Sequence, residues 1–104
     1  MASIKYESNL AFDVVTNYEE FRKSGMSREE TIERITEDFS EELQDFDDGI
    51  DVLIGIAIAL VKKKELITSI ADEVRKEIKN HRDSGDVNPI FTSIENMLRS
   101  EAHV

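Results

Sequence analysis

Apolar residues recur three or four positions apart along most of this chain, a spacing that places them on one face of an α-helix. The pattern predicts five helices, over residues of about 9–24, 27–46, 49–63, 65–81 and 89–100, and it predicts no strand. The stripes of the first two predicted helices are Leu10, Val14, Tyr18 and Phe21, and then Ile32, Ile35, Phe39 and Leu43.

Residues that start and stop helices lie where these stripes begin and end. Ser27 is followed three positions later by Glu30, which is the capping-box pattern of a helix start. Gly25, after the first predicted helix, suits the left-handed residue that ends a helix. Asn88 and Pro89 form a favourable pair of cap and first position for the last helix.

The third predicted helix is apolar nearly all round, which is typical of a helix at the centre of a bundle. Its β-branched residues are also compatible with a buried strand, but its length and the periodic helices on either side favour a helix. Gly55, Ala57 and Ala59 are small enough to let a neighbour approach, and Asp47 or Asp48 is predicted to cap its start. The predicted fold is therefore an all-α, single-domain bundle of four to five helices around residues 49–63, with flexible ends at 1–7 and 101–104.

The composition narrows the classes of partner. The 104 residues fit one domain, and the net charge of −10 argues against nucleic acid and anionic membranes as partners. An opposite field attracts a basic protein, although acidity also simply favours solubility. The chain has no cysteine, and residues 1–5 lack the apolar core of a signal peptide. Its longest apolar stretch, residues 52–61, is about half of what a membrane-spanning helix needs, so we expect a cytoplasmic protein.

A run of carboxylates without any basic residue separates the second predicted helix from the core of the third. On the second helix, like charges three or four positions apart repel by roughly 0.2–0.5 kcal/mol per pair, so stability alone does not favour them. Those at the start of the third helix gain from its dipole. We expect this run to bind a basic partner, with a solvated face or a metal site as alternatives. It consists of Glu37, Asp38, Glu41, Glu42, Asp45, Asp47, Asp48 and Asp51.

The spacing of these carboxylates does not match known metal motifs well. A calcium loop that opened at Asp45 would need glycine at its sixth position and glutamate at its twelfth, where this chain has Ile50 and Ile56. The pairs at positions 30 and 33, and at 42 and 45, look a little like those of all-helical nucleotide pyrophosphatases, but each lies on a single helix without a matching pair. We therefore predict neither a metal nor a cofactor.

Catalytic chemistry is not indicated either. His81 and His103 have no nucleophile or metal-ligand partner at useful spacing, and we expect both at the surface. The four glycines form no phosphate-binding loop. The sequence predicts a protein that is not an enzyme and has no catalytic residue.

The pattern Tyr18-x-x-Phe21-x-x-x-Gly25-Met26-Ser27-x-Glu29-Glu30, then Ile32-x-x-Ile35-x-x-x-Phe39, an acidic stretch and an apolar helix, resembles a known family. It is similar to the small all-helical immunity proteins of bacterial polymorphic-toxin and contact-dependent inhibition systems, in particular the type 3 immunity family. The chain departs from that family in two ways: the apolar helix carries no aromatic residue, and Lys63 or Lys64 stands in place of the glycine in the following turn. The resemblance implies a cytoplasmic protein that binds and blocks one cognate toxin domain, often a nuclease.

Three functional hypotheses follow. The first is an immunity protein whose carboxylates steer it to a basic toxin while apolar anchors slow its release. The second is an acidic helical adaptor, or a mimic of nucleic-acid charge, that binds basic proteins in general. The third is a metal-dependent helical nucleotide hydrolase. The sequence does not indicate the oligomeric state.

Overall fold

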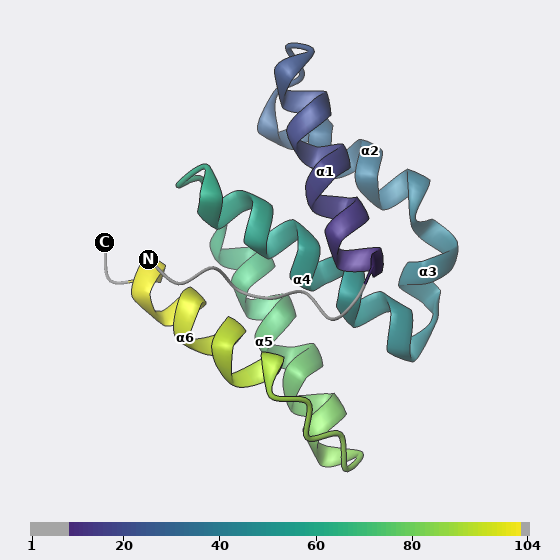
Figure 1. The fold of residues 1–104 in the computed structure, drawn as a ribbon, viewed down its shortest axis with the longest axis vertical. Coiled ribbons are helices and arrows are strands. Elements are labelled where there is room, and N and C mark those ends of the chain that lie inside the picture. Colours follow the sequence, from purple (N-terminus) through teal and green to yellow (C-terminus); the bar gives the residue numbers. More distant parts are fainter. Residues whose placement is uncertain (1–8, 103–104) are drawn as a thin grey trace.

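The computed structural model of this chain describes residues 9–102, and within them the fold consists of helices without strands (Figure 1). The sequence-based prediction of an all-α bundle is confirmed. The six helices are α1 (Asn9–Lys23), α2 (Arg28–Asp38), α3 (Ser40–Gln44), α4 (Phe46–Lys62), α5 (Thr68–Asp83) and α6 (Ile90–Ala102).

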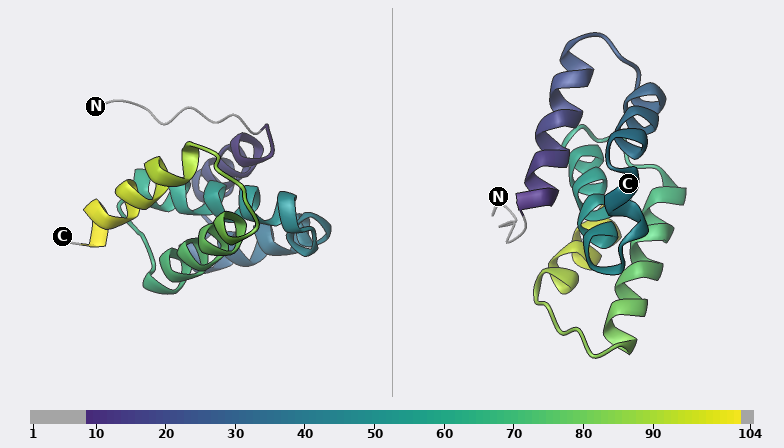
Figure 2. Two further views of the ribbon diagram at one scale, coloured as in Figure 1. Left: turned by 90° about the horizontal axis from the view of Figure 1, so that it is seen from below. Right: turned by 90° about the vertical axis from the view of Figure 1, so that its right-hand side faces the viewer.

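Helix α4 forms the centre of the bundle, as its apolar sequence predicts. It packs against α1, α3, α5 and α6, and the right-hand view in Figure 2 shows it between α1 and α5. Ile54, Ile56 and Leu60 are almost completely buried. Burial of such side chains is worth about 1.5–3 kcal/mol each, so this helix supplies much of the driving force for folding.

A glycine lets α1 and α4 approach each other closely. A Cβ atom at Gly55 would lie 2.8 Å from the carbonyl oxygen of Ala11 and 2.8 Å from the Cβ atom of Val14. No side chain fits in that space, so the expected close approach of a neighbour at Gly55 is confirmed. Ala57 and Ala59 are buried in the same helix.

The prediction of the second helix is wrong in one respect: the structure divides this helix at Phe39. This residue has φ −108° and ψ 26°, and it separates α2 from the short α3. The break redirects the chain so that both Phe39 and Leu43 pack against the core. It accounts for six helices where the pattern predicts five.

The start of α4 also differs from the prediction. The helix begins at Phe46 rather than near residue 49, and its N-cap is Asp45, not Asp47 or Asp48. The Asp45 carboxylate accepts hydrogen bonds from the amides of Asp47 (2.9 Å) and Asp48 (3.0 Å). An aspartate two residues before the first free amides suits this role, whereas Asp47 and Asp48 lie inside the first turn.

Three helices end in the same left-handed turn. The second residue after the helix has positive φ at Gly25 (103°), Gly85 (95°) and Lys64 (57°). At the end of α4 the amide of Glu65 donates to the carbonyl of Leu60 at 2.9 Å, the hydrogen bond of a Schellman motif. The prediction for Gly25 is confirmed, and Lys64 occupies a position that usually favours glycine.

The other helices begin and end within a few residues of their predicted positions. The side chain of Asn88 accepts a hydrogen bond from the amide of Ile90 at 3.1 Å, which confirms its capping role. Helix α5 begins at Thr68, three residues later than predicted. Flexible ends are predicted at 1–7 and 101–104; of these, residues 101 and 102 belong to α6, and the others lie outside the described residues. Within residues 9–102, no helix is long and apolar enough to cross a membrane.

Candidate functional site

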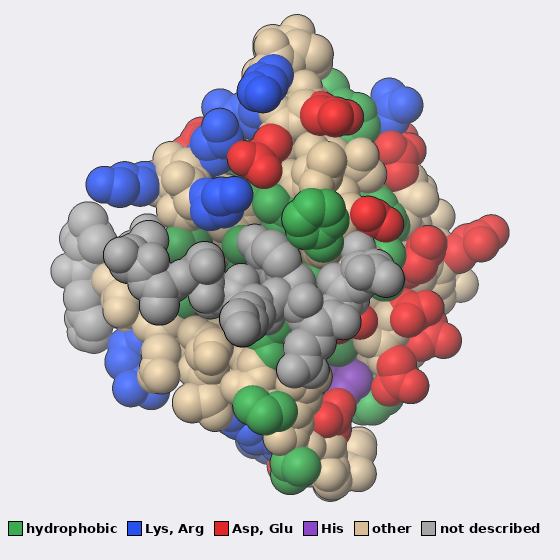
Figure 3. Space-filling model, viewed as in Figure 1, with side chains coloured by type: hydrophobic (Ala, Val, Ile, Leu, Met, Phe, Trp, Pro, Cys, Tyr) green, Lys and Arg blue, Asp and Glu red, His purple; other side chains and the backbone are tan. Residues whose placement is uncertain are grey.

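The eight carboxylates of the acidic run form one surface, which we name the acidic face. They lie at the end of α2, on α3 and along the first turns of α4. In the space-filling view, acidic side chains gather on the side of the molecule formed by these elements (Figure 3). Six are exposed and two are half-buried: Glu37, Asp38, Glu41, Asp45, Asp47 and Asp48, and then Glu42 and Asp51.

Two members of the acidic face have a local structural role. Asp38 pairs with Arg34 one turn before it, with Nε and Oδ1 3.2 Å apart. Asp45 caps α4. Asp47 and Asp48 lie in the first turn of α4, where the positive end of the helix dipole favours them, as predicted.

Most of the acidic face is left without cations. Glu37, Glu41 and Glu42, with Asp47 and Asp48, form no ion pair with any described Lys or Arg. In the part of the chain that the structure describes, no three carboxylate or histidine side chains converge closely enough to hold a metal ion. The arrangement therefore presents separate surface charges, which suit long-range attraction more than coordination.

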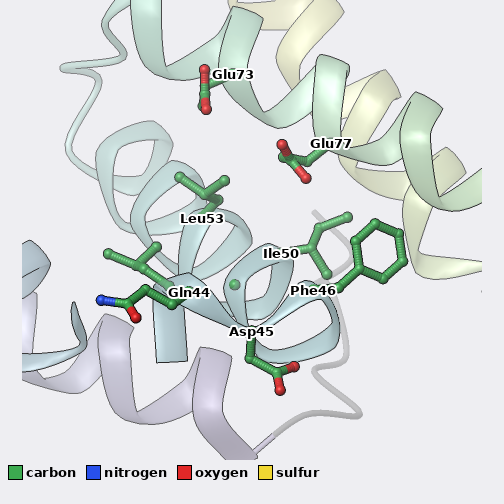
Figure 4. A pocket seen from close by; sticks show the side chains of 9 residues that line it. Gln44, Asp45, Phe46, Ile50, Leu53, Glu73 and Glu77 are labelled. Atoms are coloured by element: carbon green, nitrogen blue, oxygen red, sulfur yellow. The ribbon is translucent and has the colours of Figure 1, made fainter. Parts of the chain in front are cut away.

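A groove of about 340 Å³ adjoins the acidic face, and we name it the α4–α5 groove. Its floor comes from α3 and α4 and includes Leu43, Ile50 and Leu53, while two carboxylates from α5 stand at its other side (Figure 4). Asp45 belongs both to the groove and to the acidic face. The lining residues are Leu43, Gln44, Asp45, Phe46, Gly49, Ile50, Leu53, Glu73 and Glu77.

Sequence reasoning missed the contribution of α5 to this site. Glu73 and Glu77 are four positions apart, so they share one ridge of a helix, and that signal is readable in the sequence. What the sequence does not show is that this ridge faces the beginning of α4. Only the packing of α5 against α4 brings Glu73 and Glu77 to the acidic run.

The prediction of a surface role for His81 is wrong. The residue is 1% exposed, and its ring stacks on Phe46 with the centroids 3.9 Å apart. Nε2 lies 2.9 Å from the carbonyl oxygen of Phe46, and Nδ1 lies 3.2 Å from a carboxylate oxygen of Asp86. His81 continues the stripe of Val74 and Ile78, a signal that could have placed it in the core. His103 lies outside the described residues.

A polar network around Tyr18 lies away from the acidic face. Tyr18 is buried, and Arg22 donates hydrogen bonds to its hydroxyl oxygen (3.2 Å) and to the carboxylate of Glu65 (2.7 Å). Burial raises the pKa of the Tyr18 phenol, and the hydrogen bond from Arg22 opposes that effect only in part. This network ties α1 to the turn after α4.

The acidic face and the α4–α5 groove are thus adjacent and share one residue. Together they offer dispersed negative charge next to a small groove lined by both apolar and acidic side chains. We compared the chain with protein-family models, curated proteins and solved structures, and none of them matches it.

Proposed function

We propose that this chain is an immunity protein that binds and neutralises a basic toxin domain through its acidic face. The observation that carries the proposal is that five carboxylates of this face lack a cation among the described residues. Glu37, Glu41 and Glu42 also crowd together on two consecutive short helices. Such an arrangement does not help the isolated protein, because neighbouring like charges repel.

Electrostatics supports a basic partner. The net charge of −10 gives the whole chain a negative field that speeds encounter with a positively charged protein. A nuclease domain is basic where it binds phosphate, so a rigid acidic protein is a suitable inhibitor. The resemblance to the type 3 immunity family agrees with this reading. No chemistry is required of the inhibitor.

The identity of the partner is the first test. The chain would be purified from its native host at low salt, and the proteins that accompany it would be identified. We expect one stoichiometric basic toxin domain that stays bound through moderate salt. A salt-labile mixture of basic proteins would contradict the proposal and favour a general charge-binding module.

The second test locates the interface on the acidic face. Glu37→Lys combined with Glu41→Lys should lower the association rate with that toxin by about tenfold or more at low salt. A control with the same change in charge, Glu20→Lys with Asp83→Lys, alters exposed positions outside the acidic face. Equal losses in both variants would mean that only the net charge matters and would move the interface elsewhere.

A further inference from the structure

We propose that the α4–α5 groove binds an arginine side chain carried on an amphipathic helical segment of the protein partner. The proposal names the chemistry of the partner and rests on the proposed function. Three features of the groove support it: aliphatic side chains in its floor, a pair of carboxylates without counter-charges, and an aromatic ring held in place.

The floor suits the aliphatic part of a long basic side chain. Ile50 is buried, and Leu43 and Leu53 are half-buried beside it. Arginine covers such apolar surface with its methylene groups while its charged end stays at the edge. Apolar residues that flank the arginine on the partner helix would bury more of Leu43 and Leu53.

The charged end of the arginine would meet Glu73 and Glu77. Both side chains extend from α5 toward the α4 residues Ile50 and Leu53 (Figure 4). Neither glutamate forms an ion pair with a described cation. The guanidinium group has five donors in one plane and can bind two carboxylates at once, which also removes the repulsion between them.

The end of the groove is formed before any partner binds. The Phe46 ring lies parallel to the buried His81 ring, with an interplanar angle of 2°. Its side chain is still 50% exposed, so one part of it faces outward beside the groove. An aromatic ring in that position attracts a cation, and its fixed orientation reduces the entropy lost on binding.

The charges select among possible occupants. An anionic small molecule would meet Asp45, Glu73 and Glu77 without a compensating cation in the groove lining. A second copy of this chain would bring another net charge of −10 to an acidic surface. The groove, with a volume of about 340 Å³, has room for one long side chain.

The probe for the test is a synthetic helical peptide with two leucines and one arginine on one face. One relative has citrulline, which is neutral and of nearly the same shape, in place of arginine. Another has serine in place of both leucines. The full chain would be titrated with each peptide while the methyl resonances of Leu43, Ile50 and Leu53 are followed by NMR.

We expect saturable shifts of these methyl groups with the arginine peptide, and binding weaker by about tenfold or more with either relative. Glu73→Gln combined with Glu77→Gln should weaken the binding of the arginine peptide by a similar factor. The matched control, Glu20→Gln with Asp83→Asn, removes two charges elsewhere, and its affinity for the arginine peptide should stay within about twofold of that of the unchanged protein. Folding of each variant would be verified by its amide spectrum.

Three results would overturn the proposal. They are an absence of saturable shifts at the groove methyl groups, equal weakening in the two variants, and concentration-dependent dimers seated on the groove in sedimentation experiments. The cognate toxin separates this proposal from the proposed function. If the Glu73/Glu77 variant binds that toxin as tightly as the unchanged protein does, the groove proposal fails and the immunity function stands. If no toxin is found while the peptide binds, the immunity function fails.

Discussion

Nε2 of His81 lies 2.9 Å from the carbonyl oxygen of Phe46, a residue 35 positions earlier in the chain. A carbonyl only accepts hydrogen bonds, so the imidazole donates through Nε2. Nδ1 faces the carboxylate of Asp86 on the opposite side of the ring. His81 thereby links the end of α5 and the turn after it to the first residue of α4, next to the acidic face.

Loss of this link should destabilise the fold. His81→Phe keeps an aromatic ring that can stack on Phe46, but it removes the hydrogen bond to the Phe46 carbonyl and the contact with the Asp86 carboxylate from a buried site. We expect the free energy of unfolding to fall by about 1–3 kcal/mol, measured by denaturant titration. Asn80→Ala, on the exposed side of the same helix, should change the free energy of unfolding by no more than about 0.5 kcal/mol. A His81→Phe variant as stable as the unchanged protein would show that ring packing alone holds this corner together.

The cap of α4 makes Asp45 different from the other carboxylates of the acidic face. Its carboxylate satisfies two backbone amides, so Asp45→Ala should lower the free energy of unfolding by about 1 kcal/mol. The exposed Glu41 has no such partner, and Glu41→Ala should change the free energy by no more than about 0.5 kcal/mol. Thermal or denaturant unfolding of both variants would measure this. Equal effects would argue against the cap.

This difference changes how the acidic face is best tested. The sequence alone suggests reversing the charges of Glu41, Glu42 and Asp45 together, and from the sequence this change is expected to leave the fold intact. Since Asp45 caps α4, the triple change would lower stability as well as charge. Glu37 and Glu41 are better targets because they are exposed and their side chains have no capping role.

Local signals in the sequence account for most of the fold. The capping box at Ser27 and Glu30 is present, with the Glu30 amide 3.2 Å from the Ser27 hydroxyl oxygen. The apolar run of α4 correctly predicts a central helix. The break at Phe39 was not predictable from the stripe, because Phe39 and Leu43 keep helical spacing across it. Tertiary packing, not local preference, decides that the chain turns there.

The candidate site shows the same division between local and long-range information. Its carboxylates in positions 37–51 are adjacent in the sequence and were predicted as a group. Glu73 and Glu77 join them only because α5 packs along α4. The stripe of Val74 and Ile78 indicates that position 81 faces the core, but not that His81 stacks on Phe46. Contacts between residues so far apart have no signature in hydrophobic periodicity.

The turn after α4 stores a small amount of strain. Lys64 has φ 57°, a left-handed conformation that costs a residue with a Cβ atom about 1–2 kcal/mol. Glycine avoids that cost but loses more backbone entropy on folding, so Lys64→Gly should raise the free energy of unfolding by about 0.5–1 kcal/mol net. The neighbouring Lys63 is right-handed with φ −93°, and Lys63→Gly should instead be neutral or destabilising. Denaturant titration distinguishes the two, and a gain at both positions would contradict the conformational explanation.

Tyr18 should make the fold sensitive to alkali. Burial raises the pKa of its phenol above the ordinary value of 10.0, so the phenol of the unfolded chain ionises at a lower pH than that of the folded chain. The contribution of the protonated Tyr18 phenol to the free energy of unfolding is therefore fully present below pH 10.0, and it is lost as the pH rises through the folded-state pKa. In a Tyr6→Phe background, the near-ultraviolet absorbance of tyrosinate would report Tyr18 alone. We expect its folded-state titration above pH 10.0, and a shallower fall of stability with pH in Tyr18→Phe. Titration of the folded chain at the ordinary value would mean that water or Arg22 compensates for the burial of the hydroxyl group.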